Sequence, residues 1–155
     1  MALINSNSFA DFSKKIKARA TDIKERIASL KGKRIVVGIP PSAQYPNGKS
    51  VVQVADCITY GVNENGSPMR AGPRRFMSVA VEENGKKWNR MLQEGVRQAY
   101  RQQKRPNLRP LLIKVGERIK SDIQKTMLDM DVYDTGRMHD SVRLLQINST
   151  EVSSD

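Results

Sequence analysis

The sequence predicts an α+β protein: a small mixed or antiparallel sheet packed by two or three long helices, with a basic amphipathic helix at the N-terminus. Apolar residues recur at spacings of three and four over three long stretches, which is the helical period. Two short stretches, Arg34 to Ile39 and Met138 to Ile147, have the apolar and β-branched character of strands. A two-stranded sheet is marginal alone, so either the loop 40–49 holds an irregular strand or another subunit completes the sheet.

Length and charge bound the organisation. The chain of 155 residues predicts one domain over 1–147, followed by a flexible, acidic, Ser-rich tail over 148–155. Lys and Arg number 27 against 16 Asp and Glu, so the formal net charge is +11. Such a surface attracts polyanions, either nucleic acid or the acidic face of a protein partner, and charge alone leaves both open.

The first predicted helix spans residues 8–31. Ser8 and Asp11 have the spacing of a capping box, and Gly32 provides the stop. Its apolar stripe consists of Phe9, Phe12, Ile16, Ala20, Ile23, Ile27 and Leu30. The many Lys and Arg residues on the rest of its surface are either a solvated face or part of an arm that reaches a neighbouring subunit.

The middle of the chain predicts a strand, a loop and two helices. Arg34 to Ile39 is the strand, and Ser50 caps a short helix that ends at Gly61. After a loop over 62–75, the second long helix spans 77–103. Its predicted inward residues are Val81, Trp88, Leu92, Val96 and Ala99.

The third long helix begins near Pro110, where the missing N–H does no harm in the first turn. Its apolar stripe consists of Leu112, Val115, Ile119, Ile123 and Met127. A turn over 133–136 follows, in which Gly136 is expected to adopt a left-handed conformation. The segment from Met138 to Ile147 is then predicted to be a strand.

The chemistry of the chain argues against an enzyme. The single cysteine, Cys57, and the single histidine, His139, lie far apart in sequence, and no residue set has metal-ligand spacing. Asp134-Thr135-Gly136 matches the triplet of aspartic proteases, but its flanks are polar and no second copy exists. We therefore expect no catalytic residues, no cofactor and no metal. The N-terminus lacks the pattern of a signal peptide, and no stretch is long and apolar enough to span a membrane.

Two groups of residues are candidates for binding. A basic loop and the later turn are candidate partner interfaces: Arg70, Arg74, Arg75, Phe76, Met77, Asp134, Thr135, Gly136 and Arg137. A basic run is the candidate DNA-facing group: Lys86, Lys87, Arg90, Arg97, Arg101, Lys104 and Arg105. No DNA-reading motif accompanies the second group, so any contact with DNA would be non-specific.

Five segments in series resemble the tail-completion and head–tail joining proteins of tailed bacteriophages. They are Val37-Gly38-Ile39, Val52 through Gly61, Ala71 through Met77, Val115 through Ile123, and Asp134 through Val142. The resemblance covers roughly residues 35–147. Two departures are Thr59-Tyr60-Gly61-Val62, where the family usually has Glu-Phe/Tyr-Gly-Thr, and the basic pair before Phe76, where it usually has Arg-Pro. The N-terminal helix is also longer and more basic than is usual there.

The resemblance implies a structural virion protein that forms a ring, commonly a hexamer, at the head–tail junction. It would be assembled in the cytoplasm of the bacterial host, and its partners would be other neck proteins such as the tail terminator, tail tube or connector. Under this hypothesis Phe76 fills a pocket on a neighbour, while Arg74 and Arg75 pair with carboxylates. The alternative is a basic accessory protein that binds nucleic acid non-specifically.

Overall fold

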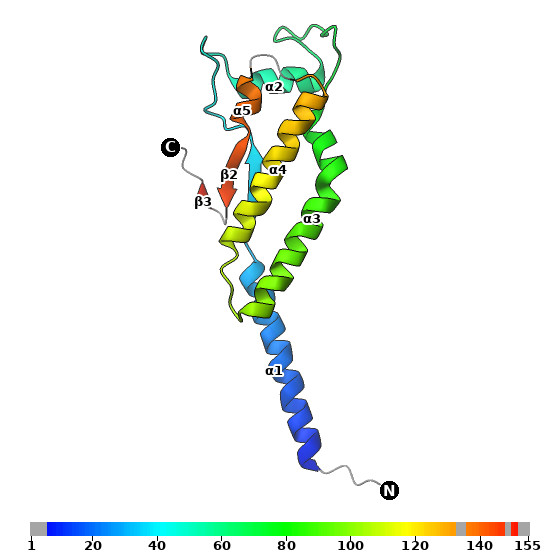
Figure 1. Ribbon diagram of the computed structural model, residues 1–155, viewed down its shortest axis with the longest axis vertical. Helices are drawn as coiled ribbons and strands as arrows, with labels where there is room; N and C mark the ends of the chain where they lie inside the picture. Colours follow the sequence, from blue (N-terminus) through cyan, green and yellow to red (C-terminus); the bar gives the residue numbers. More distant parts are fainter. Residues whose placement is uncertain (1–5, 133–135, 148–149, 152–155) are drawn as a thin grey trace. The chain divides into compact units, whose positions relative to one another are not determined.

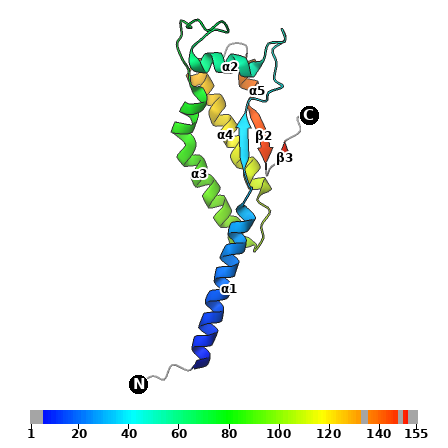
Figure 2. The same cartoon turned by 180° about the vertical axis from the view of Figure 1, so that it is seen from behind.

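A computed structural model describes residues 6–132, 136–147 and 150–151 (Figures 1 and 2). Its contacts divide the chain into two compact units, Met1–Lys33 and Arg34–Asp155. The single domain over 1–147 stays a prediction, and the two units are described separately. Of the predicted tail, only Thr150 and Glu151 are described, and they form a short strand.

The first unit is the helix α1, Ser6–Leu30. It ends as predicted: Gly32 has a φ of 75°, and the Lys33 amide donates to the Leu30 carbonyl at 3.2 Å. The apolar stripe of α1 is exposed. Among the described large members, Phe12, Ile16, Ile23 and Ile27 each retain half or more of their accessible surface, and Leu30 retains 37%.

The second unit confirms the predicted α+β class. Its helices are α2 (Val51–Tyr60), α3 (Phe76–Gln102), α4 (Arg109–Asp129) and α5 (Arg137–Ser141). Its strands are β1 (Ile35–Gly38), β2 (Arg143–Ile147) and β3 (Thr150–Glu151), hydrogen-bonded in the order β1-β2-β3 with both pairs antiparallel. The register shifts between Val36 and Val37, which leaves Leu145 of β2 as the extra residue of a bulge.

Helix α4 is the centre of this unit, since it contacts α3 on one side and β1 and β2 on the other (Figure 2). Four of the five predicted stripe residues are buried, and the fifth, Ile119, packs partly buried against the same core. The sheet lies close to Gly116, where an added Cβ would lie 2.5 Å from the Leu144 side chain. A glycine here therefore sets how closely helix and sheet can pack.

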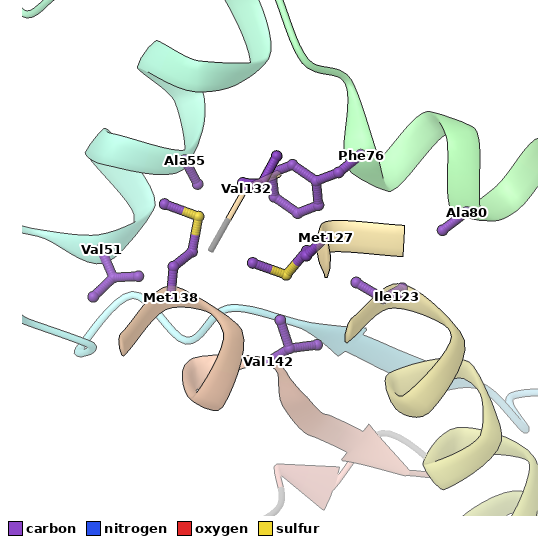
Figure 3. Close-up of a cluster of buried hydrophobic side chains, with 9 residues drawn as sticks. All are labelled: Val51, Ala55, Phe76, Ala80, Ile123, Met127, Val132, Met138 and Val142. Atoms are coloured by element: carbon purple, nitrogen blue, oxygen red, sulfur yellow. The ribbon is translucent and has the colours of Figure 1, made fainter. Parts of the chain in front are cut away.

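The main core joins segments from almost the whole unit. It contains Val51, Ala55, Phe76, Ala80, Ile123, Met127, Val132, Met138 and Val142 (Figure 3). A smaller cluster of Leu112, Leu144 and Ile147 lies between α4 and the sheet. Helices α2 and α5 and the start of α3 thus close over the C-terminal half of α4.

Two predictions about these elements were wrong. The segment Met138–Ile147 is not one strand: residues 137–141 form α5, and β2 begins only at Arg143. Left-handed Gly136 starts the helix, and its carbonyl accepts from the Asp140 amide at 2.8 Å. Val81 does not face inward but is 55% exposed, because Phe76 and Ala80 supply the core-facing positions of the first turns of α3.

Candidate interaction surface

Two loops beside α2 are held as small hairpins. In the first, Gln44 and Ser50 form an antiparallel bridge, with Asn47-Gly48 at the turn. This isolated bridge lies outside the sheet β1-β2-β3, so among the described residues the loop 40–49 adds no strand to it. In the second, Val62 and Pro68 form the bridge around Asn65-Gly66.

An ion pair joins the two hairpins. Lys49 Nζ lies 2.7 Å from Glu64 Oε1. The hydrogen bond to Glu64, with the charge of that carboxylate, raises the pKa of Lys49 above its ordinary value. Both groups are solvated, so the pair orients the hairpins more than it stabilises the fold.

Helix α2 begins and ends as predicted, and its C-terminus holds the end of the loop 62–75. Ser50 Oγ accepts from the Gln53 amide at 3.4 Å, and Gly61 closes the helix with a φ of 67°. A Cβ on Gly61 would lie 2.4 Å from the backbone nitrogen of Pro73. The Arg74 amide then donates to the Ile58 carbonyl at 2.9 Å, so the basic loop is bonded directly to α2.

Arg74 connects this loop to the end of α4. Its guanidinium donates to the Asp131 carbonyl, and Asp131 is the one described non-glycine residue with a positive φ, 54°. The amides of Asp131 and Val132 donate back to the carbonyls of Leu128 and Met127, which is the Schellman arrangement. Arg74 thus makes one contact within its own chain, and the expected carboxylate partner on a neighbour stays a prediction.

Phe76 does not lie where the prediction of a pocket on a neighbour would place it. Its side chain is 1% exposed and lies among Met127, Val132 and the other residues of the main core (Figure 3). It therefore fills a pocket of its own chain, and its removal would damage the core instead of reporting on an interface. Met77 packs partly buried against the same core.

The remaining candidates of the first group are scattered around this end of the unit. Arg70 and Arg75 are exposed, and Arg137 donates from Nε to the Gln44 carbonyl at 2.8 Å, which ties α5 to the first hairpin. Gly136 is buried with a φ of 76°, so its predicted left-handed conformation is confirmed. Asp134 and Thr135 lie outside the described residues.

The predicted DNA-facing group forms a stripe on α3. Lys86, Arg90, Arg97 and Arg101 are exposed and recur at helical spacing on the face turned away from α4. Glu94 interrupts the stripe and pairs with Arg97 at 3.0 Å. Lys104 and Arg105 are exposed in the loop that follows α3.

The seventh, Lys87, belongs to a polar cluster that sequence reasoning missed. Asp122 of α4 is 7% exposed and accepts from Trp88 Nε1 at 2.8 Å and from Arg118 Nε at 3.0 Å, with Lys87 Nζ at 4.0 Å. Burial raises the pKa of Asp122, but the bonds from Trp88 and Arg118 and the nearby cations outweigh burial and hold it below its ordinary value. This cluster fixes α3 against α4 and opens into no described cavity.

A shallow groove of about 510 Å³ lies between α3 and α4, beyond this cluster. Its lining includes Gly95 and Leu111, and a Cβ on Gly95 would lie 2.2 Å from Leu111 Cδ1. The groove holds one carboxylate and one ammonium, Glu94 and Lys114, and no nucleophile with a base. The groove therefore follows the packing of α3 against α4, and its lining residues do not form a catalytic set.

The sheet has a free edge, which agrees with the alternative that another subunit completes it. Strand β1 pairs with β2 on one side, and within the described ranges it makes no backbone hydrogen bond on its other side. Val36, at the bulge, is exposed. The β-branched run predicted the strand, but nothing in it showed which edge would stay unpaired.

Among the described residues, no cluster of three or more His, Cys, Asp or Glu side chains could hold a metal ion, and no helix is long and apolar enough to cross a membrane. Comparisons with models of protein families, with curated proteins and with solved structures each found no match.

Proposed function

We propose that the protein is a non-catalytic structural subunit that forms a ring at the head–tail junction of a tailed bacteriophage. The observation that carries the proposal is the way the five resembling segments relate to one core. Each contributes a side chain packed in the main cluster: Val37, Ala55, Phe76, Ile123 and Met138 are examples. The resemblance therefore follows the packing of one unit, as a shared fold would require.

The open edge of β1 supports assembly through neighbouring copies. An exposed edge strand carries unpaired N–H and C=O groups that another chain can pair with. A head-to-tail contact of this kind, repeated around a rotation axis, closes into a ring. The hairpins beside α2, with exposed Arg70 and Arg75, offer a second surface of the same unit for a neck partner.

The experiment is the mass of the purified protein in solution, compared with that of the variant Val36→Lys. A lysine at an edge strand opposes pairing with another strand, so we expect the ring to dissociate into folded monomers. Val36→Thr, which keeps the β-branch, is the matched control and should assemble normally. A multimer unchanged by Val36→Lys would show that this edge is not the contact.

The basic stripe on α3 favours a second candidate, non-specific binding of nucleic acid. Adding short duplex DNA at 50 and 200 mM salt separates the two functions. If several cations contact phosphates, the rise from 50 to 200 mM salt should weaken DNA binding by about a thousandfold. The association of a protein ring should change far less over that range. Strong, salt-sensitive binding that Lys86→Glu with Arg90→Glu abolishes would make nucleic acid the leading function.

A further inference from the structure

Helix α1 carries an exposed apolar seam with a seven-residue repeat. Ile16, Ile23 and Leu30 recur every seven residues, and Ala20 and Ile27 recur four residues after the first two. In the heptad notation a to g, the first set occupies d and the second a, and Phe9 occupies d one heptad earlier. The seam residues Ile16, Ile23 and Ile27 are 50–56% exposed.

The charges beside the seam all have one sign. Lys17 and Lys24 occupy the e positions, and Arg19 and Arg26 occupy g. The carboxylates of the helix, Asp11, Asp22 and Glu25, occupy c and f, away from the seam. Arg26 pairs with Asp22 at 2.8 Å along the helix, and the other three cations are exposed.

This pattern opposes pairing of α1 with a second copy of itself. In a parallel coiled coil, g faces e of the partner, and in an antiparallel one, g faces g and e faces e. Either arrangement would bring Lys and Arg against Lys and Arg, which is destabilising. Cations on both flanks instead complement a helix with Glu or Asp at its own e and g positions.

The narrow width of the apolar seam favours a helical partner over a lipid surface. A strict a/d stripe is the narrow seam of a coiled coil, whereas a globular or interfacial helix presents a broader apolar face. In α1 the e and g positions next to the seam are charged from Lys17 to Arg26, which keeps the apolar face narrow over this stretch. Phe12, at g one heptad before Arg19, widens the apolar face only at the start of the helix.

We infer that α1 is a docking helix for an acidic amphipathic helix of a partner protein, with which it forms a coiled coil. This inference is independent of the proposed function, because it uses only the first unit. It also assigns a role to the basic residues of the helix: they select the partner and exclude a second α1.

The test uses the full chain and two labelled peptides of four heptads. Both carry Ile and Leu at a and d; one has Glu at every e and g position, and the other has Lys. Fluorescence anisotropy should show a one-to-one complex with the Glu peptide, at least on the order of tenfold tighter than with the Lys peptide. The difference should shrink as salt rises.

Three variants sharpen the test. Ile16→Ser with Ile23→Ser should abolish binding of the Glu peptide. Lys17→Glu with Lys24→Glu should weaken it and improve binding of the Lys peptide. The matched control, Lys14→Glu with Lys15→Glu, changes the net charge equally but lies at the b and c positions outside the flanks, and should retain the preference. Trp88 fluorescence checks that the second unit stays folded.

Several outcomes would overturn the inference. Binding of neither peptide, or equal binding of both, would show that α1 does not select an acidic helix. Self-association that Ile16→Ser with Ile23→Ser removes would make a second copy the occupant. Binding to phosphatidylserine-containing vesicles without binding to the Glu peptide would make α1 a membrane-surface helix.

Discussion

Helices α1 and α4 carry nearly the same apolar spacing and have opposite surroundings. In α4 the stripe from Leu112 to Met127 is covered by α3 on one side and the sheet on the other. In α1 the stripe from Phe12 to Leu30 is exposed. Periodicity therefore identifies a helix and its apolar face, but the rest of the chain decides whether that face becomes core. The exposed face is the one that remains available for a partner.

The largest difference between the two helices is expected when one residue of each apolar stripe is truncated to alanine. Met127→Ala removes a fully buried side chain and should lower the free energy of unfolding by about 2–5 kcal/mol. Ile23→Ala, at a residue that is half exposed, should change it by less than about 0.5 kcal/mol. Urea unfolding followed by Trp88 fluorescence and by circular dichroism measures both. A comparable loss for Ile23→Ala would mean that α1 is core after all.

A smaller effect compares one aspartate from each helix. Asp122→Asn keeps an acceptor for Trp88 but loses the charge that holds Arg118, and should cost about 2 kcal/mol. Asp22→Asn breaks only an exposed pair one turn apart and should cost less than about 0.5 kcal/mol.

The pH dependence of Asp122 has a definite sign. Its pKa is lower in the folded protein than in the unfolded chain, so its contribution is complete above the unfolded value, about 3.9, and is lost as pH falls through the folded value. The wild type should therefore lose more stability on acidification below about pH 4 than Asp122→Asn does. Identical acid profiles would show that this carboxylate contributes no pH-dependent stability.

The smallest expected effect concerns a feature that α4 has and α1 lacks, a glycine at a close approach. Gly116→Ala would force the Leu144 side chain to move, and better helix propensity offsets about 1 kcal/mol of the packing cost, so the net loss should be less than about 2 kcal/mol. Gly85→Ala, where the nearest atom to the added Cβ is 3.9 Å away, should stabilise by up to about 1 kcal/mol. Thermal unfolding of the pair separates packing from propensity, and equal shifts would show that the sheet tolerates a Cβ at Gly116.

The sequence was sufficient for features that depend on local chemistry. The helix ends at Gly32 and Gly61, the cap at Ser50 and the early proline of α4 are where their side chains or backbone freedom require them. It was insufficient where distant segments decide. Phe76 was expected at an interface because a basic loop precedes it, yet α4 and α5 build the pocket that it fills.

The same limit applies to polar residues. Arg118 lies four residues before Asp122 on α4, a spacing visible in the sequence, but only the crossing of α3 over α4 brings Trp88 to this carboxylate. Asp131 gave no sign that it would take a left-handed conformation, since glycine more often ends a helix in this way. Such residues are identified by tertiary contacts that no periodicity encodes.

The pairing of β1 with β2 has a kinetic consequence. Ile35 lies opposite Ile147, so the sheet joins the two ends of the second unit in sequence. Loop closure over such a separation is entropically costly and slow, whereas α3 and α4 meet through a short connection. During synthesis the long helices can pair while β1 still awaits its neighbour. A chain that stops before Arg143 would carry every long helix and leave that strand open on both edges.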